Sequence, residues 1–346
     1  MSRGILGPGR RPRQGNKGLI LIVALWSLCI LSAFAVIIGY QVRQKLVLIK
    51  RLEERGKLHL IAQAGMIKAA VELRKEDEKD YDALNDPWCD NPGAFRNVAM
   101  SDGVFDIYYD YTDSGSGEVR RRYGMVDEES RVNINAVDFK VLKRLFYLAL
   151  NADESDAEGL AASVMDWRDA DSSLILSDRS AEDSFYRSGI YPYESKDAGL
   201  QVLEELLLVR GFNENIFEKI KAYITIYSSG KVNINTAPKT VLMALGIDAN
   251  VAENIMFFRA GKDGINLTAD DNYFESIGNI VPELSRNYSM TVNQIAALSS
   301  VVTQSITVRS SVFRGKSRAR LNSRRDTNEI DFVIDRSGRV LYCREG

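Results

Sequence analysis

Histidine and cysteine are scarce in this 346-residue chain, which has one histidine, His59, and three cysteines, Cys29, Cys89 and Cys343. A single histidine argues against a Ser/His/Asp triad or a histidine-rich zinc centre, because that residue would have to serve every role. Neither sign of charge is in clear excess, with 45 Lys and Arg against 47 Asp and Glu, so the composition does not indicate a nucleic-acid binder. The 45% of hydrophobic residues excludes wholesale disorder, and the length suffices for one large core or two to three domains.

The amino terminus has the charge pattern of a membrane protein. Residues 1–18 contain five basic residues and no acidic one, and the 22 residues from Leu19 to Tyr40 carry no charge. At about 1.5 Å rise per residue, such a helix spans the ~30 Å hydrocarbon core of a bilayer. Because basic flanks stay in the cytoplasm, we expect a single pass with the residues after 40 on the far side of the membrane.

Two interpretations of this segment compete. The first is an ordinary signal anchor or uncleaved signal peptide. The second starts from Gly18, because a basic leader, a glycine and a long apolar helix follow one another in precursors of type IV pilin-like proteins. In those precursors a membrane peptidase cleaves after the glycine, which here would be between Gly18 and Leu19. Most of them have Glu five residues after the cleavage site, where this chain has Val23. Loss of residues 1–18 would change the net charge from −2 to −7.

The remaining patterns predict an α+β fold. Apolar residues at three- and four-residue steps, including Leu60, Ile67 and Val71, indicate that the helix continues to about residue 80. Alternating aromatic and polar residues in 104–126 predict a hairpin with a Ser/Gly turn, helical patterns dominate from 133 to 298, and strand patterns return after that. The expected domains are the leader (1–18), the transmembrane helix (19–40), a first helix-and-strand part (41–130), an α-helical insertion (131–298) and C-terminal strands (299–346).

One segment occurs twice, 100 residues apart. The sequence RVNINAV at 131–137 is echoed by KVNINTA at 231–237, and a Leu-rich helical pattern follows each copy. Asn suits a helix cap or a turn, and Pro238 suits the first turn of a helix. We therefore interpret the repeated asparagines as structural caps.

Taken in order, several segments resemble the type K minor pseudopilins of bacterial type II secretion systems. These are the Gly18 leader with Val23, and DEESRVNIN (127–135), MDWRDAD (165–171), AEDSFY (181–186), LEELLLVRGF (203–212) and KVNINTAP (231–238). The resemblance implies a pilin-like α/β domain with a large α-helical insertion of the SAM or helix-hairpin-helix kind. It also implies a non-enzymatic subunit of the inner membrane, cleaved by prepilin peptidase, with its bulk in the periplasm.

The resemblance further implies a place at the tip of a short periplasmic pseudopilus, with I- and J-type minor pseudopilins and other pseudopilins as partners. Such a subunit takes part in pseudopilus initiation and in export of folded proteins across the outer membrane. The missing Glu fits that place. In ordinary subunits this carboxylate pairs with the terminal amine of the subunit ahead, and a first subunit has none ahead of it.

Acidic residues are densest between 166 and 183, and the members of this group are Asp166, Asp169, Asp171, Asp178, Glu182 and Asp183. Carboxylates are hard oxygen ligands that suit calcium, although the spacing is not that of an EF-hand. The alternative is a solvated surface whose aspartates cap helices. The family resemblance implies calcium in the helical insertion. A second acidic loop, from Asp263 to Asp271, is the weaker candidate.

Three further possibilities are a disulfide, a hydrolytic site and a DNA receptor. Cys89 and Cys343 would both lie in an oxidising compartment and could form a disulfide. A hydrolase using Asp166 and Asp169 lacks a recognisable nucleophile motif. The rival function is a membrane-anchored helix-hairpin-helix DNA receptor, suggested by the segments around Gly211 and Gly246. In these hairpins Asn213 and Asp248 take the place of the second glycine, and a carboxylate there would repel phosphate, so we expect no nucleic-acid partner.

Overall fold

The computed structural model describes residues 17–76, 78–112, 118–189, 191–268, 270–322 and 326–346. Most of the expected leader, residues 1–16, and the Ser/Gly turn of the expected hairpin lie outside this part. The chain divides into two units, Met1–Lys57 and Leu58–Gly346.

The first unit is formed by the amino-terminal part of helix α1 (Lys17–Lys75). Every residue from Gly18 to Lys50 is exposed, including the apolar side chains of the expected span. Within the described residues, α1 is the helix long and apolar enough to cross a membrane. The helix was expected to reach about residue 80, and it ends at Lys75.

An antiparallel sheet lies in the second unit, with strands in the order β1-β2-β9-β10-β11. Its strands are β1 (Val98–Met100), β2 (Gly103–Thr112), β9 (Val312–Leu321), β10 (Thr327–Asp335) and β11 (Val340–Glu345), while β3 (Val119–Arg122) pairs with β2 and β4 (Val126–Asp127) pairs with β9. The expected hairpin is confirmed, since Tyr109 pairs with Arg122. The C-terminal strands are also confirmed, and they turn at Gly338 with φ of 87°.

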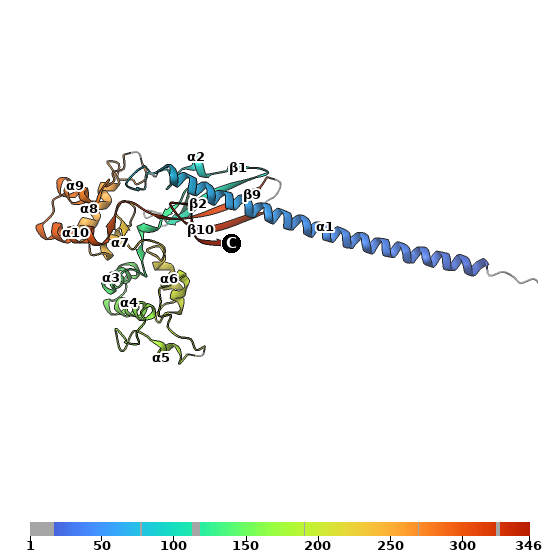
Figure 1. Cartoon of the computed structure of the whole chain (residues 1–346), viewed down its shortest axis with the longest axis horizontal. Helices are drawn as coiled ribbons and strands as arrows, with labels where there is room; N and C mark the ends of the chain where they lie inside the picture. The colour runs from blue at the N-terminus through green and yellow to red at the C-terminus, as the bar shows by residue number, and fades with distance from the viewer. Residues whose placement is uncertain (1–16, 77, 113–117, 190, 269, 323–325) are drawn as a thin grey trace, which may run out of the picture. The chain divides into compact units, whose positions relative to one another are not determined.

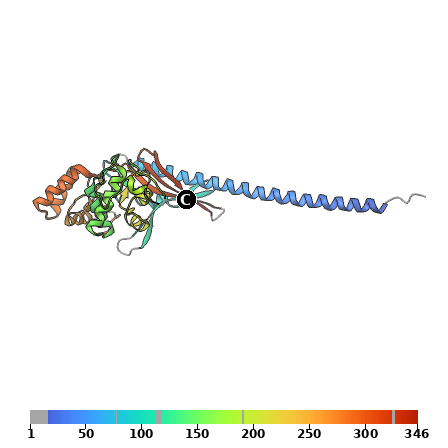
Figure 2. The ribbon, with the colours of Figure 1, turned by 90° about the horizontal axis from the view of Figure 1, so that it is seen from below.

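One face of this sheet packs on the carboxyl-terminal part of α1, from Leu58 onward (Figures 1 and 2). Helix and strand approach closely at Gly65, where an added Cβ would lie 2.1 Å from Ser317 Oγ. The buried face of the helix combines small residues, such as Ala62 and Ala69, with the larger Leu58, Ile61 and Leu73. Within this unit the stripe that the sequence pattern singled out faces outward instead, and its members Leu60, Ile67 and Val71 are 63%, 63% and 44% exposed.

The other face of the sheet carries charged pairs. Alternate residues of β9 project there, and Arg314, Arg318 and Arg320 pair with Glu128 (2.7 Å), Glu329 (2.7 Å) and Asp106 (3.1 Å). This alternation follows from the two-residue period of a strand. The pairs with Glu329 on β10 and Asp106 on β2 lie across neighbouring strands, so they help to fix the register of the sheet on its polar side.

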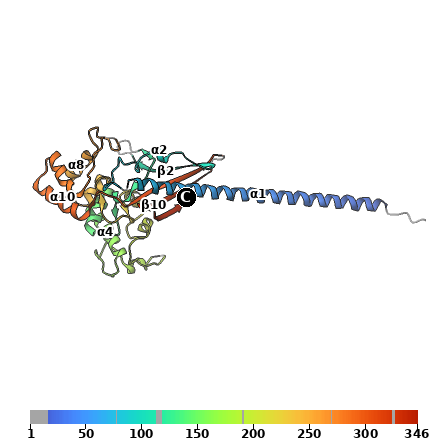
Figure 3. The same cartoon turned by 45° about the horizontal axis from the view of Figure 1, so that its top comes forward.

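The helical region consists of two structurally similar halves, seen as separate groups of helices in Figures 1 and 3. The first half comprises β5 (Val132–Asn133), α3 (Phe139–Leu150), α4 (Glu154–Arg168), α5 (Asp183–Tyr186), η2 (Leu203–Leu208), α6 (Glu214–Ile220) and β6 (Ile224–Thr225). The second comprises β7 (Val232–Asn233), α7 (Lys239–Ala244), α8 (Ala249–Arg259), η3 (Ile277–Asn279), α9 (Ile280–Asn287), α10 (Val292–Ser305) and β8 (Ile306–Thr307). The remaining short elements are α2 (Pro92–Phe95) and η1 (Glu128–Ser130).

Each half is closed by a short parallel strand pair. Val132 pairs with Ile224 in the first half, and Val232 pairs with Ile306 in the second. Helix α10 runs to Ser305, so the expected insertion boundary at 298 falls within a helix, about two helical turns before its end.

The repeated asparagines do not cap helices as expected, because Asp138 and Pro238 occupy the N-cap positions of α3 and α7. Instead, the Asn135 side chain bonds both the N–H and the C=O of Leu200, and Asn235 does the same with Phe274. Their structural role is confirmed, although they bridge distant backbone segments rather than helix ends.

In each half, one turn-holding arginine donates hydrogen bonds to the backbone of the repeated segment (131–137 or 231–237). Arg168 donates to the carbonyls of Ile134 and Val137, and Arg259 donates to those of Ile234 and Ala237. The two arginines end α4 and α8, the second helix of each half. This correspondence indicates that the repeated sequence segment belongs to a repeated structural unit.

A buried polar cluster joins the sheet to the helical region. Asp127 Oδ2 accepts hydrogen bonds from Ser310 Oγ (2.6 Å), Thr236 Oγ1 (2.5 Å) and Asn233 Nδ2 (3.2 Å), and Oδ1 accepts from Glu129 N (2.8 Å). Burial, with a contribution from Glu129, raises the pKa of Asp127 well above its usual range. This one side chain therefore ties three separate segments together.

Candidate metal centre

Three carboxylates converge in the first half of the helical region, at the loop that follows α4. Asp169 is the C-cap residue of α4, Asp171 lies two residues later, and Glu182 precedes the short helix α5. One oxygen from each lies within 4.8 Å of the others. The loop therefore folds back so that residues far apart in the sequence share one small volume.

The electrostatics of this cluster are unfavourable without a cation. Asp169 Oδ1 and Glu182 Oε1 are buried and lack a hydrogen-bond partner among the described residues. Burial and the neighbouring carboxylates, chiefly Asp166 and Asp169, raise the pKa of Glu182 to about 7. Burial and Asp171 likewise raise the pKa of Asp169. Like charges held this close disfavour the ionised state unless something positive lies between them.

The other expected ligands have different surroundings. Asp166 accepts a hydrogen bond from Ile175 N at 3.2 Å, and burial raises the pKa of its carboxyl. Asp183 accepts two bonds from Ser195 and pairs with Arg187 at 2.8 Å, contacts that lower its pKa. Asp178 is exposed and pairs with Arg179. Asp183 and Asp178 are thus outside the converging group.

Asp197 was not among the expected ligands, yet it belongs to the surroundings of this cluster. Its negative charge contributes to the raised pKa values of both Glu182 and Asp169, and its Oδ1 accepts a bond from Ser195 Oγ. The backbone of Asp197 has φ of 53°, a conformation uncommon outside glycine, Asn and Asp. Asp197 follows a Tyr-Pro-Tyr segment and stands apart from the acidic residues of 166–183. No spacing pattern in the sequence therefore indicates that it lies near the cluster.

The cluster fits a hard divalent cation. Its ligands are carboxylate oxygens, two of them buried without partners, which is the donor chemistry that Ca²⁺ takes. The second acidic loop differs, since Asp270 and Asp271 already accept bonds from Lys262 N, Leu267 N and Thr268 Oγ1. Those carboxylates shape their own loop.

The two cysteines of the expected disulfide are free thiols in the structure. Cys89 is buried, with Sγ 3.3 Å from Tyr109 Oη, whereas Cys343 is exposed on β11, at the edge of the sheet. Tyr109 belongs to β2, and β9 and β10 separate β2 from β11, so the expected pairing is wrong for this structure.

The two hairpins behind the DNA-receptor alternative have their backbone amides occupied. Asp248 caps α8 by accepting bonds from Asn250 N and Val251 N, and Asn213 caps α6 by accepting from Ile216 N. Free amides at a helix start are what a phosphate group would bind. A carboxylate already in that position disfavours the DNA-receptor function.

Comparison with known proteins gives one consistent family. Residues 124–229, which include the acidic cluster, match the family model described as "Type II secretion system (T2SS), protein K". The type II secretion system protein K of Aeromonas hydrophila is 27% identical over 68% of this chain and 72% of its own length. The chain resembles the type II secretion system protein K family.

A solved structure supports the fold of the chain over most of its length. The chain resembles a chain of the crystal structure of the GspK-GspI-GspJ complex from the enterotoxigenic Escherichia coli type 2 secretion system, with a TM-score of 0.60 and 18% identity. The match covers 88% of this chain and 99% of that one. The α+β fold with an amino-terminal apolar helix is therefore confirmed.

Proposed function

We propose that this chain is the tip subunit of a type II secretion pseudopilus and assembles there with I- and J-type minor pseudopilins. The observation that carries the proposal is the exposed apolar stripe of α1, Leu60, Ile67 and Val71. These side chains lie on the face of the helix away from the sheet, so the second unit leaves them uncovered. A stripe of this spacing suits a partner helix. The relative from enterotoxigenic Escherichia coli was solved in a complex with I and J partners.

The experiment is co-purification of the full chain, in detergent, with tagged I- and J-type partners. Ile67→Asp should remove most of the association, since it places a charge in the middle of the apolar stripe. Val292→Asp is the matched control, because Val292 is 81% exposed and lies on α10, in the second half of the helical region. Equal recovery of partners with both variants would overturn the role of the stripe.

We further propose that the acidic cluster holds Ca²⁺ through Asp169, Asp171 and Glu182. The converging oxygens and the unpartnered atoms support this assignment. When bound, the cation would supply positive charge that neutralises the three carboxylates. It would tie the end of α4 to the start of α5, and so order the intervening loop, rather than take part in catalysis.

The proposal also covers the position of this chain in the membrane and in the filament. The chain is inserted through Leu19–Tyr40 with its amino terminus in the cytoplasm, cleaved after Gly18, and then extracted into the filament. Val23 leaves the subunit without a carboxylate to offer a subunit ahead of it, which suits the first position. The role is structural and serves pseudopilus initiation and export of folded proteins.

A further inference from the structure

Basic side chains are concentrated on α1 directly after its apolar segment. Residues 41–52 include four basic residues and no acidic one. These four residues form the basic band: Arg43, Lys45, Lys50 and Arg51. All four side chains are exposed, and among the residues that the structure describes no acidic side chain pairs with any of them. The chain itself therefore does not neutralise this group of positive charges.

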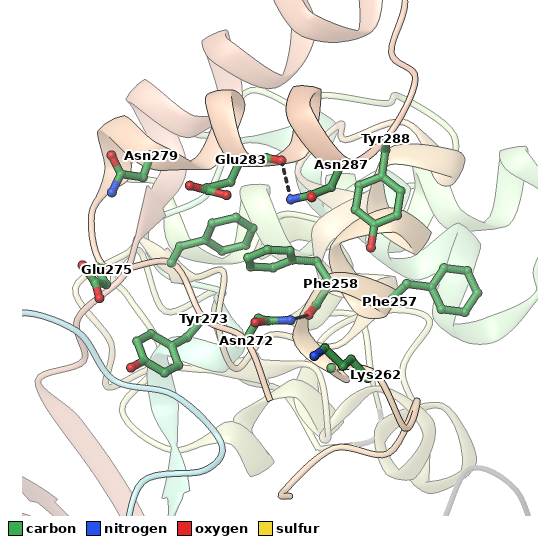
Figure 4. A pocket seen from close by; sticks show the side chains of 12 residues that line it. Phe257, Phe258, Lys262, Asn272, Tyr273, Glu275, Asn279, Glu283, Asn287 and Tyr288 are labelled. Carbon is green, nitrogen blue, oxygen red and sulfur yellow. Dashed lines mark hydrogen bonds between the residues drawn. The ribbon is translucent and has the colours of Figure 1, made fainter. Parts of the chain in front are cut away.

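Charged side chains elsewhere in the described chain commonly have partners. In the polar pocket beside α8 and α9, Glu283 pairs with Arg286 at 3.0 Å, and the carbonyl of Glu283 accepts a bond from Asn287 Nδ2 (Figure 4). On α1 itself, Glu53 pairs with Lys57 at 3.2 Å. The basic band differs from these sites, because its charges are left for something outside the chain.

The height of the band along α1 matches the lipid headgroups next to the expected span, Leu19–Tyr40. At about 1.5 Å rise per residue, Arg43 lies about 4.5 Å and Lys45 about 7.5 Å beyond Tyr40 along the helix axis. The headgroup region on each side of a bilayer is about 5–8 Å thick. Lys50 and Arg51 lie about 15–17 Å beyond Tyr40, where long side chains that bend toward the bilayer come within a Debye length of about 8 Å of the headgroups.

The band surrounds the helix and does not follow one face. With about 3.6 residues per turn, Arg43 and Lys45 point to nearly opposite sides of the helix. Lys50, seven residues after Arg43, returns to the side of Arg43, and Arg51 points to a side between these two directions. A partner helix contacts a single face, as the apolar stripe of α1 would provide. Lipid surrounds a single spanning helix on all sides, so the arrangement of the band favours lipid.

We propose that the basic band binds the anionic headgroups of membrane phospholipids, of which phosphatidylglycerol is the example to test. Anionic lipid surfaces attract basic residues next to a span, and this attraction falls off within a Debye length. The inference rests on the proposed membrane placement, since the band reaches headgroups only when Leu19–Tyr40 spans the bilayer. The bound lipids would hold the subunit in the membrane, and extraction into a filament would break these contacts.

The test uses the full chain in vesicles that contain equal amounts of phosphatidylcholine and phosphatidylglycerol. Electron paramagnetic resonance measures the share of spin-labelled lipid that the protein immobilises, with the label on either lipid in otherwise identical samples. We expect a preference of about threefold for the phosphatidylglycerol label, and a smaller preference at higher salt. Equal immobilisation of the two labels would overturn the proposal.

Inorganic phosphate distinguishes a lipid headgroup from free phosphate as the ligand. At equal ionic strength, phosphate and chloride should reduce the preference equally, because both act by screening. A stronger effect of phosphate than of chloride would indicate a site for free phosphate, and it would contradict the lipid assignment.

A double variant and a control locate the interaction on the helix. Arg43→Gln with Lys45→Gln should lower the preference about twofold, since these residues lie at the level of the headgroups. Arg55→Gln is the control, because Arg55 is an exposed base of the same helix that lies about 22 Å beyond Tyr40. The bases of residues 1–18 are the same in every sample, so a difference between variants reports the band. An unchanged preference in the double variant would remove the band from the lipid contact.

The outcome is separable from the proposed tip assembly. Loss of lipid preference with normal recovery of I- and J-type partners would reject the lipid contact alone. Release of the chain from the vesicles by alkaline extraction would reject the membrane placement itself. A double variant that keeps the lipid preference but loses its partners would assign the band to a partner protein, and this result would also overturn the inference.

Discussion

At the scale of single residues, Glu182 makes the acidic cluster sensitive to pH. Its carboxyl has a pKa raised to about 7, against a usual value near 4.5, so the folded chain binds more protons than the unfolded chain between these values. Stability in chelator should therefore fall as pH rises from about 4.5 to 7. Thermal melting at pH 5 and pH 7.5 measures this change, and Glu182→Gln should flatten it.

Calcium should reverse that loss, because a bound cation favours the ionised carboxylates and stabilises the folded state. At pH 7.5, saturating Ca²⁺ should raise the melting temperature of the wild type and leave Asp171→Asn nearly unchanged. Asp183→Asn is the informative comparison. Asp183 bonds Ser195 and Arg187, so its replacement should lower the melting temperature in chelator as well. A calcium response that survives Asp171→Asn would remove this residue from the site.

Asp127 should matter more for stability than any exposed carboxylate. An amide at this position would either point its N–H group at Glu129 N and leave that buried donor unpaired, or face Asn233 Nδ2 with a second donor. We expect Asp127→Asn to lower the free energy of unfolding by about 1–3 kcal/mol in urea titrations. Asp110→Asn, which breaks the half-exposed pair with Arg121, should cost about 0.5 kcal/mol. Equal costs for the two variants would show that the junction tolerates the loss.

The six candidates predicted from the sequence include all three members of the acidic cluster, but the sequence did not distinguish them from the other three. Six acids lie between 166 and 183, and their density alone cannot distinguish a converging carboxylate from one that bonds Ser195 or faces solvent. Asp169 and Glu182 meet because the loop folds back between α4 and α5, which local spacing does not specify. The family resemblance implied calcium, and calcium binding stays a prediction.

At the scale of elements, replacing a turn-holding arginine even by lysine should destabilise the fold. Arg259 is 4% exposed and donates to Ala237 O at 2.5 Å and Ile234 O at 3.4 Å. Both bonds come from Nη1, which the rigid planar guanidinium holds in place. The single nitrogen of a lysine sits on a flexible stem and is a compact, strongly hydrated charge, so fixing it at the same buried position costs more. We expect Arg259→Lys to destabilise the fold by about 2 kcal/mol.

Two measurements check this expectation. Urea titration gives the loss of stability, and hydrogen exchange should show faster exchange of the amides in 232–237. Arg286→Lys is the control, because Arg286 is an exposed residue that pairs with Glu283 on the same helix. A stability difference below about 0.5 kcal/mol between the two variants would contradict the proposed role of Arg259.

Elements were more predictable than their packing. The apolar period of α1 and the alternation in β9 and β10 gave the correct element types, because period is a local property. The buried face of α1 was not foreseen. The sheet covers the face of α1 that contains Gly65, Ile61 and Leu73 and leaves the opposite apolar stripe exposed, so the tertiary contact decides which stripe is covered.

At the scale of the whole molecule, the amino terminus decides between the pilin-like subunit and an ordinary signal anchor. A prepilin peptidase would cut before the apolar helix, between Gly18 and Leu19, whereas an ordinary signal peptidase cuts after the apolar segment. We expect co-expression with the peptidase to shift the intact mass by the mass of residues 1–18, leaving Leu19 as the first residue. Gly18→Leu should abolish the shift, and Gly39→Leu, which changes a glycine beyond the cleavage site, should not. An unshifted mass in the presence of active peptidase would indicate an ordinary signal anchor. A cut at residue 35 or beyond would remove the helix that the filament proposal needs.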